Sequence, residues 1–520
     1  MRSQTTTCGA GAFAAAGSSG ARLALVTGSA RSSALQSSAL RSSAAGITAG
    51  LIGWFILVEI VSGILQGFYV PLFSDIVIQL GIRDADVNWF EAGQLLLSAL
   101  VVPILAKLGD MFGHKRILLV AAILTALASW GLVFADSFWT FLLFWSLQGF
   151  YVVWLPLEIA LIFERGRQQN RGVSMTRRAA GLLVVGLEAG AIMGALAAGR
   201  IYAATGDLGL TLMVPAVAVS LIAVVIWVFV PESTPSGERR LDTWGVVLLA
   251  WGLLLVTGAL AWMRLIGELA LGPVAWAGVV GLFVVGVGVL VWFVRHERGH
   301  ASPVIDVRVL ARPDMWPVQA TAFLIGISLL GAQGPLSTYA GTDSSLGYGL
   351  GLDATERSYV IGLYLVSLIV GAVLFAVTSR RVSPRLALIA AAALVGIGYA
   401  LFLPFHLEVW QVLLNLSIAG IGCGALVGAL PAAAAAAAPL GKTGEASGLT
   451  NTTKTIGGAF SSAVFGVVLA AGAGSVVGQT ASSLGGYLTV WAICAAGGFL
   501  AAVLLVFVPK VAFADAPPAG

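Results

Sequence analysis

The sequence predicts an all-α, polytopic membrane protein. Of its 520 residues, 58% are hydrophobic and only 10% are charged. A soluble domain carries about 25% charged residues, so this chain cannot cover a water-facing surface of normal size. Apolar runs of about 20 residues recur with basic breaks between them, and a helix of that length spans the hydrocarbon of a bilayer. Barrel strands would instead be short and alternate in polarity.

Fourteen such runs follow a long polar stretch at the N-terminus. Residues 1–46 are rich in Ser, Ala, Gly and Arg and contain no acidic residue, so we expect a disordered tail. A transit peptide or a start codon placed too early would give the same composition. Residues 511–520 form a short C-terminal tail. The predicted spans are residues 48–71, 87–107, 116–135, 138–163, 178–203, 209–230, 243–263, 271–294, 315–340, 357–377, 385–404, 408–435, 446–473 and 484–508.

The basic residues predict how the spans are oriented. With both termini cytoplasmic, the inner segments hold all but four of the 28 Lys and Arg residues, as is typical of multi-pass proteins of the plasma membrane. The four on the outer side are Arg83, Arg200, Arg264 and Arg357. This asymmetry explains the net charge of +4, so no nucleic-acid partner is expected. The nearby acids Asp84, Asp86 and Glu91 are interpreted as part of a solvated outer loop.

A repeat and a linker divide the chain. The hexapeptide LQGFYV occurs at residues 65–70 in the first span and again at 147–152 in the fourth. Transporters with three-plus-three inverted repeats place their first and fourth helices equivalently along the substrate path, although chance identity is the alternative. A polar, turn-rich linker follows the sixth span. The expected domains are a six-helix bundle (47–230), the cytoplasmic linker (231–242), an extra helix pair (243–294) and a second six-helix bundle (295–510).

The loop after the second span carries a recognisable motif. Residues 106–116 resemble the signature Gly-x-x-x-Asp-basic-x-Gly-basic-basic of the major facilitator superfamily, with Ala106 and Met111 as departures. The matching residues are Asp110, Gly113, Lys115 and Arg116. In that family the loop latches one bundle to the other and gates their alternation, so the resemblance implies a gating role for these four residues. An ordinary charged turn is the alternative.

Small residues in the fifth span give a second resemblance. Gly186, Gly190 and Gly194 lie at intervals of four and resemble the antiporter motif Gly-x-x-x-Gly-Pro-x-x-Gly-Gly, with Ala191 where the proline should be. Small residues at this spacing let two helix backbones approach closely. We therefore expect the three glycines to pack against a neighbouring helix, whether or not the antiporter motif applies.

Three further segments, residues 241–245, 293–306 and 444–458, are similar to the fourteen-span drug:proton antiporter branch of the superfamily. The resemblance implies the major facilitator fold, with two six-helix bundles plus two extra transmembrane helices. It also implies a secondary transporter, not an enzyme, that exports small lipophilic or cationic compounds in exchange for protons. Trp145 departs from this pattern, because the branch carries there a buried arginine implicated in proton movement. Proton coupling must then rest on other groups.

Three carboxylates lie at least five residues inside the ends of the predicted spans. A charge at mid-bilayer costs about 2.5 to 3.5 kcal/mol on insertion scales, so such residues usually face a wet cavity. Glu59 can bind a proton there and release it when a cationic substrate arrives; a neutral structural glutamate is the alternative. Glu188 lies about 200 degrees around its helix from the glycine face, which favours coupling or cation recognition. Glu158 is the third candidate, and pairing with Arg165 is its simpler interpretation.

Polar and aromatic side chains share helix faces with these glutamates. In the first span they follow Glu59 at steps of three, four and three residues, and in the fourth they surround the repeated hexapeptide. Aromatic rings can bind planar or cationic molecules. The expected cavity-lining residues are Ser62, Gln66, Tyr69, Trp145, Gln148 and Tyr151.

The expected function is therefore proton-coupled export of a small molecule by alternating access, by a monomer embedded in membrane lipid. A proton-driven importer of an organic solute is the alternative, because the arginine and the proline are missing. A membrane-embedded enzyme or receptor is less expected, since no His-Glu-x-x-His or Gly-x-Ser-x-Gly motif is found. The three cysteines are scattered, so we expect no metal site and no cofactor. All four histidines (His114, His296, His300 and His406) are placed in loops.

Overall fold

The computed structural model describes residues 50–168, 172–233, 242–268, 272, 274–300, 303–379, 381–438, 443–471 and 480–508. The predicted tails and most of the predicted linker lie outside these ranges. By backbone contacts the chain separates into Met1–Gly53 and Trp54–Gly520, and only the second unit is considered below. Its described residues form helices, turns and loops, with no strand among them.

Fourteen helices of the described chain are long and apolar enough to cross a membrane, which confirms the predicted number. The observed ends lie within a few residues of the predicted ones, except that the first span continues to Leu80 instead of ending at residue 71. The spans are Gly50–Leu80, Asp84–Phe112, His114–Val133, Phe138–Arg165, Ala179–Thr205, Leu208–Phe229, Thr243–Met263, Val274–Gly299, Trp316–Gly341, Ala354–Thr378, Pro384–Leu401, Val409–Ala437, Ala446–Ala471 and Leu484–Phe507.

We call residues 54–233 the N-half, and we call the end of each span that the charge distribution assigns to the cytoplasm its inner end. The first helix of the N-half covers residues 50–68. The other elements are η1 (Val70–Leu72), α2 (Phe73–Leu80), η2 (Asp84–Asp86), α3 (Val87–Phe112), α4 (His114–Val133), α5 (Phe138–Gln148), η3 (Gly149–Val153), α6 (Trp154–Gln168), α7 (Gly172–Thr205) and α8 (Leu208–Phe229).

Two helices, α9 (Thr243–Glu268) and α10 (Val274–Gly299), separate the N-half from residues 303–508, which we call the C-half. The elements of the C-half are α11 (Val307–Leu310), α12 (Trp316–Gly326), the π-helical turn η4 (Ile327–Gly331), α13 (Gln333–Gly341), η5 (Ser344–Leu346), α14 (Ala354–Thr378), α15 (Pro384–Leu401), α16 (Val409–Ala437), α17 (Thr443–Ala471) and α18 (Leu484–Phe507).

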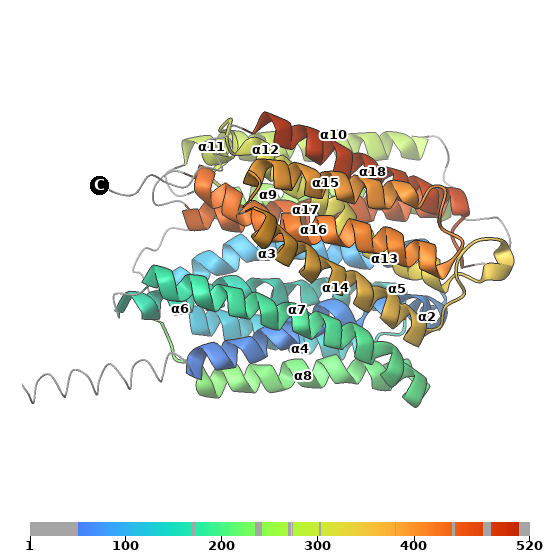
Figure 1. Ribbon diagram of the computed structural model, residues 1–520, viewed down its shortest axis with the longest axis horizontal. Helices are drawn as coiled ribbons and strands as arrows, with labels where there is room; N and C mark the ends of the chain where they lie inside the picture. The colour runs from blue at the N-terminus through green and yellow to red at the C-terminus, as the bar shows by residue number, and fades with distance from the viewer. Residues whose placement is uncertain are drawn as a thin grey trace, which may run out of the picture. The chain divides into compact units, whose positions relative to one another are not determined.

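The helices run side by side and pack mainly within each half (Figure 1). In the N-half, α4 contacts α5, α6 and α8, and α6 contacts α7. In the C-half, α15 contacts α16 and α18, α14 contacts α16, and α12 contacts α17. The two halves meet chiefly where α3 packs on α17 and α7 packs on α14. The extra helices α9 and α10 pack on each other, and α9 also reaches α17 and α3.

Glycines bring the first helix and α7 into close contact. A Cβ on Gly190 would lie 2.0 Å from the carbonyl oxygen of Ile60, and one on Gly67 would lie 2.1 Å from that of Ala191. A Cβ on Gly186 would lie 3.2 Å from the carbonyl oxygen of Ile56, and one on Gly194 would lie 2.9 Å from that of Ile64. Because no larger side chain fits at such distances, the two backbones pack directly against each other.

The two copies of the repeated hexapeptide share a local feature. In both, the α-helix gives way to a 3₁₀ turn, at η1 in the first copy and at η3 in the second. The copies also touch, because Gln148 Nε2 donates a 2.7 Å hydrogen bond to the hydroxyl of Tyr69. The same amide donates to Ser129 Oγ at 3.0 Å. The repeat therefore forms part of the packing between the first and fourth spans.

Candidate functional site

Two of the predicted glutamates meet inside the N-half. Glu59 of the first helix and Glu158 of α6 are both fully buried. Their carboxyl groups lie within interaction range of each other. None of the four carboxyl oxygens has a hydrogen-bond partner of normal geometry among the described residues. Two adjacent buried carboxylates cannot both be ionised without large repulsion, so this arrangement is chemically suited to holding a proton.

The expected pairing of Glu158 with Arg165 is wrong. Arg165 instead donates from Nη2 to the backbone oxygen of Glu232, at 3.4 Å. Glu158 is fully buried and has Glu59 of the first helix as its charged neighbour. Burial of this kind is costly for an acidic group, which makes Glu158 as notable as Glu59.

The third glutamate has a different environment. Glu188 of α7 is partly exposed and interacts electrostatically with Lys454 of α17, which is also partly exposed. The pair joins the N-half to the C-half. The count of inner basic residues includes Lys454, although the predicted span 446–473 contains it. Its role as the partner of Glu188 was therefore missed, while its position inside a predicted span was the signal that could have revealed it.

All four groups lie well inside their helices. Glu59 lies nine residues beyond Gly50, the first described residue of its span, and Glu188 lies sixteen residues from the start of α7. Lys454 lies eleven residues from the start of α17, and Glu158 lies ten residues before the end of α6. Side chains of both halves therefore place ionisable groups inside membrane-spanning helices.

Most of the expected cavity-lining residues are packed away. Tyr69, Trp145 and Gln148 are at most 2% exposed, and Ser62 is also buried. The ring of Trp145 contacts Tyr69 edge-on, with centroids 5.0 Å apart. These four residues thus belong to the packing between spans in this conformation.

Only Gln66 and Tyr151 of the expected cavity-lining set are partly exposed. Tyr151 interacts electrostatically with Glu91 of α3 and with Glu59. Tyr151 and Glu91 therefore extend the acidic environment of the glutamate pair.

The predicted solvated outer loop is wrong. Asp84, Asp86 and Glu91 are 5%, 2% and 6% exposed. The reason is that the outer ends of the two halves close over them. Asp84, for example, accepts a 3.2 Å hydrogen bond from the hydroxyl of Tyr487 in α18, and its N–H donates to the backbone oxygen of Thr480.

Further contacts close the outer ends. Arg357 of α14, expected on the outer side, is only 4% exposed; it forms a buried ion pair with Asp75 and donates from Nε to the backbone oxygen of Pro71 at 2.9 Å. Ser337 donates to the backbone oxygen of Val70. The hydrogen bonds that join the two halves in the described chain all lie at this end. We call these contacts the outer latch.

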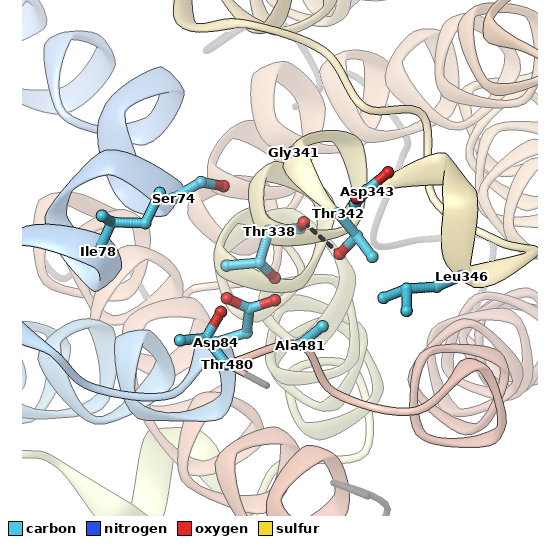
Figure 2. Close-up of a pocket in the computed structure, with 10 residues that line it drawn as sticks. All are labelled: Ser74, Ile78, Asp84, Thr338, Gly341, Thr342, Asp343, Leu346, Thr480 and Ala481. Atoms are coloured by element: carbon cyan, nitrogen blue, oxygen red, sulfur yellow. Dashed lines mark hydrogen bonds between the residues drawn. The ribbon is translucent and has the colours of Figure 1, made fainter. Parts of the chain in front are cut away.

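A small polar cavity lies beside the outer latch (Figure 2). Ser74, Ile78 and Asp84 line it from the N-half, and Thr338 and Thr342 are among its lining residues from the C-half. Its volume is about 330 Å³. Because residues of both halves form its wall, the cavity changes shape whenever the outer ends separate.

At the inner side, the predicted gating loop is held by its own half. Gly113 has φ +106°, a conformation that favours glycine, and a Cβ there would lie 2.6 Å from Glu232 Oε1. Arg116 forms an ion pair of 3.3 Å with Glu232, and Lys115 donates to the backbone oxygen of Trp227 at 2.9 Å. Asp110 lies 3.1 Å from His114 Nε2. These contacts fasten the loop to the end of α8.

The comparison with known families fits this architecture. The sequence profile of the Major Facilitator Superfamily matches residues 55–462, more than three quarters of the chain. The chain belongs to the major facilitator superfamily. Its fourteen candidate spans fit the fourteen-span branch.

Individual relatives of this transporter include proteins named for efflux. The probable actinorhodin transporter of Streptomyces coelicolor is 26% identical over 398 residues, which cover 74% of this chain and 65%, less than two thirds, of that relative. The drug efflux pump JefA of Mycobacterium tuberculosis is 25% identical over 408 residues, covering 76% of this chain and 75% of JefA. The fold is similar to that of the POT family transporter PepTSo, with a TM-score of 0.60, 14% identity and coverage of 88% and 97%.

Proposed function

We propose that this transporter exports small lipophilic or cationic compounds across the plasma membrane in exchange for protons. The names of two relatives, a probable actinorhodin transporter and a drug efflux pump, support transport of small organic compounds, and the second name supports export. The distribution of basic residues supports cytoplasmic termini. In this proposal one copy of the chain is the working unit, and the bundles 47–230 and 295–510 are the two moving bodies.

The single observation that carries the proton-coupling part is the Glu59–Glu158 pair. Both carboxyl groups are fully buried and close to each other, with no other hydrogen-bond partner among the described residues. A pair that shares a proton is tolerated in such a place, whereas a doubly ionised pair is not. Loss of the shared proton therefore requires the helices to rearrange and admit water or a cation. That requirement links protonation to conformation.

Glu188 and Lys454 act as the recognition pair in this proposal. An incoming cation competes with the Lys454 ammonium for the Glu188 carboxylate. Lys454 also supplies a positive charge inside a span, in a chain whose fourth span has Trp145 instead of an arginine. Closure of the outer latch makes the described conformation one that receives substrate from the inner side.

The direct test uses membrane vesicles. In everted vesicles an imposed pH gradient should drive accumulation of a lipophilic cationic dye by the wild type. Glu59→Gln should lose the gradient-driven accumulation while it keeps exchange of internal for external dye, because exchange needs no net proton movement. Equal gradient-driven accumulation by Glu59→Gln would remove the glutamate pair from the mechanism.

Import of an organic solute is the second candidate, and two residues favour it. Trp145 and Ala191 stand where the antiporter branch has its arginine and its proline. Import predicts the opposite result in the same assay, namely accumulation in right-side-out vesicles with the outside acidic and no dye uptake by everted ones.

A further inference from the structure

Three metal-ligating side chains meet at the inner end of the extra helix pair. Asp242 immediately precedes α9, His296 lies in the last turn of α10, and His300 follows that helix. The expectation that all four histidines lie in loops is thus wrong for His296, as it is for His114, the first residue of α4. Asp242 Oδ2 is 2.9 Å from His296 Nε2 and 3.5 Å from His300 Nδ1. No step of the transport proposal uses these residues.

The spacing of the ligand atoms suits one small ion. The three atoms lie within 4.8 Å of one another. Zinc binds nitrogen and oxygen at about 2.0 to 2.2 Å, so two ligand atoms of a tetrahedral site lie about 3.4 Å apart. The Asp242–His300 separation matches that value. The shorter Asp242–His296 separation is a hydrogen-bond length, and binding would lengthen it by about 0.5 Å.

The local structure orients these groups. Asp242 Oδ1 accepts the N–H of Gly245 at 2.9 Å as the cap of α9, which leaves Oδ2 directed at the imidazoles. His296 and His300 are four residues apart, and their rings stack with centroids at 5.4 Å. Both rings therefore face the same side of the end of α10. A ligand fixed by a hydrogen bond from its other oxygen is typical of metal sites.

An independent observation comes from Glu297. Its side chain is fully buried, and neither carboxyl oxygen has a hydrogen-bond partner of normal geometry in the described chain, although the backbone of Val304 and Ile305 lies near. A Cβ on Gly245 would lie 2.3 Å from Glu297 Oε1 and 2.6 Å from Asp242 Oδ2. Two carboxylate oxygens therefore flank one glycine. Such a buried acidic pair is costly unless a cation lies beside it.

We propose that Asp242, His296 and His300 bind a divalent transition-metal ion of the zinc class, with the buried carboxylate of Glu297 adding negative charge beside them. Two imidazoles and one carboxylate form a ligand set that Zn²⁺ and Co²⁺ accept, with a water in the fourth position. The ion would tie the start of α9 to the end of α10, next to the segment that leads into α11. It would serve as a fastening of the extra helix pair, separate from the transport path.

The test measures metal binding directly. The purified full chain, in nanodiscs, freed of its affinity tag and stripped with a chelator, is titrated with Co²⁺ while its visible absorption is followed. One Co²⁺ per chain should bind with the intense bands of a tetrahedral site, and Zn²⁺ should displace it. His296→Ala and His300→Ala should each weaken Zn²⁺ affinity at least about 10-fold. His406→Ala is the matched control, because His406 lies at the outer end near Phe402 and should leave binding unchanged.

A second measurement guards against misfolded variants. Zn²⁺ should raise the unfolding temperature of the wild type and of His406→Ala, but not that of the His296→Ala/His300→Ala double variant. Failure of the wild type to bind Co²⁺ or Zn²⁺ at micromolar concentrations would overturn the proposal, whatever the variants do. Equal binding by the wild type and a folded double variant would overturn it as well.

Discussion

The two acidic sites of the transporter lie inside membrane-spanning helices but have opposite surroundings. Glu59 is fully buried against Glu158, another acid, and has no other hydrogen-bond partner in the described chain. Glu188 is partly exposed and lies near the ammonium group of Lys454. Location inside a span alone therefore does not set the role of a carboxylate. Its neighbour and its access to water do, which is why we assign protons to the first site and cations to the second.

The sharpest way to test this comparison is to treat the buried pair as one unit. Glu59→Gln and Glu158→Gln should each lower gradient-driven transport by about 100-fold, and the double variant should be no worse than the poorer single variant, because the two residues hold one proton together. Initial rates of dye efflux in everted vesicles measure this. Glu408→Gln, at an exposed position beyond the outer end of the C-half, is the control. If the double variant instead lost the product of the two single losses in transport rate, the two glutamates would be independent sites.

The second test reverses the charges of the exposed pair. Glu188→Gln and Lys454→Met should each reduce transport of a cationic dye by about 10-fold. The first change removes the carboxylate, and the second removes the positive charge that balances it. The swap of Glu188→Lys with Lys454→Glu should restore part of that loss. A neutral lipophilic substrate should be affected less than the cation. If cation and neutral substrate respond alike, this pair positions helices and does not recognise charge.

The smallest expected effect concerns access to the exposed pair. Arg357→Ala removes the buried partner of Asp75, so the outer ends should open more often. With Ser74→Cys as the reporter and Cys8→Ser as the background, labelling by a membrane-impermeant maleimide from outside should speed up at least about five-fold.

The matched comparison is Arg200→Ala, because Arg200 also joins the two halves at this end, through Tyr359, but is exposed, and exposed contacts contribute little. Its labelling rate should stay near that of the parent. Unchanged labelling in Arg357→Ala would show that the ion pair does not hold the outer ends together.

Hydropathy and charge were enough to predict the helices but not their neighbours. All fourteen spans and the position of Glu59 inside the first of them follow from sequence, because each depends on one helix and the bilayer. The complete burial of Glu59 does not follow, because a wet cavity was expected around it. The contact of Glu158 with Glu59 depends on how α6 turns toward the first helix, and helix periodicity does not fix that. Lys454 was counted with the inner basic residues even though a predicted span contains it, because the positive-inside rule considers charge and not partners. Glu91 was expected in a solvated loop and Arg357 on the outer side, and only the meeting of the two halves buries them.

The residues expected to line the cavity also show that helix periodicity does not predict contacts between helices. Tyr69, Trp145 and Gln148 share a face with functional candidates, so a cavity wall was a reasonable expectation. The 3₁₀ turns at η1 and η3 bring that face into contact between spans instead. Periodicity predicts which side chains share a helix face. Whether that face lines a water-filled cavity depends on which helix packs against it.

The glycine contact between the first helix and α7 has one more consequence. Gly67 and Gly190 leave no side chain between the two backbones, so one helix cannot slide or tilt without carrying the other. Glu59 lies on the first helix and Glu188 on α7, so the proposed proton site and the proposed cation site belong to one rigid pair of helices. A displacement that protonation causes at Glu59 is therefore transmitted directly to Glu188. A bulky side chain between the two helices would separate these movements without changing either glutamate.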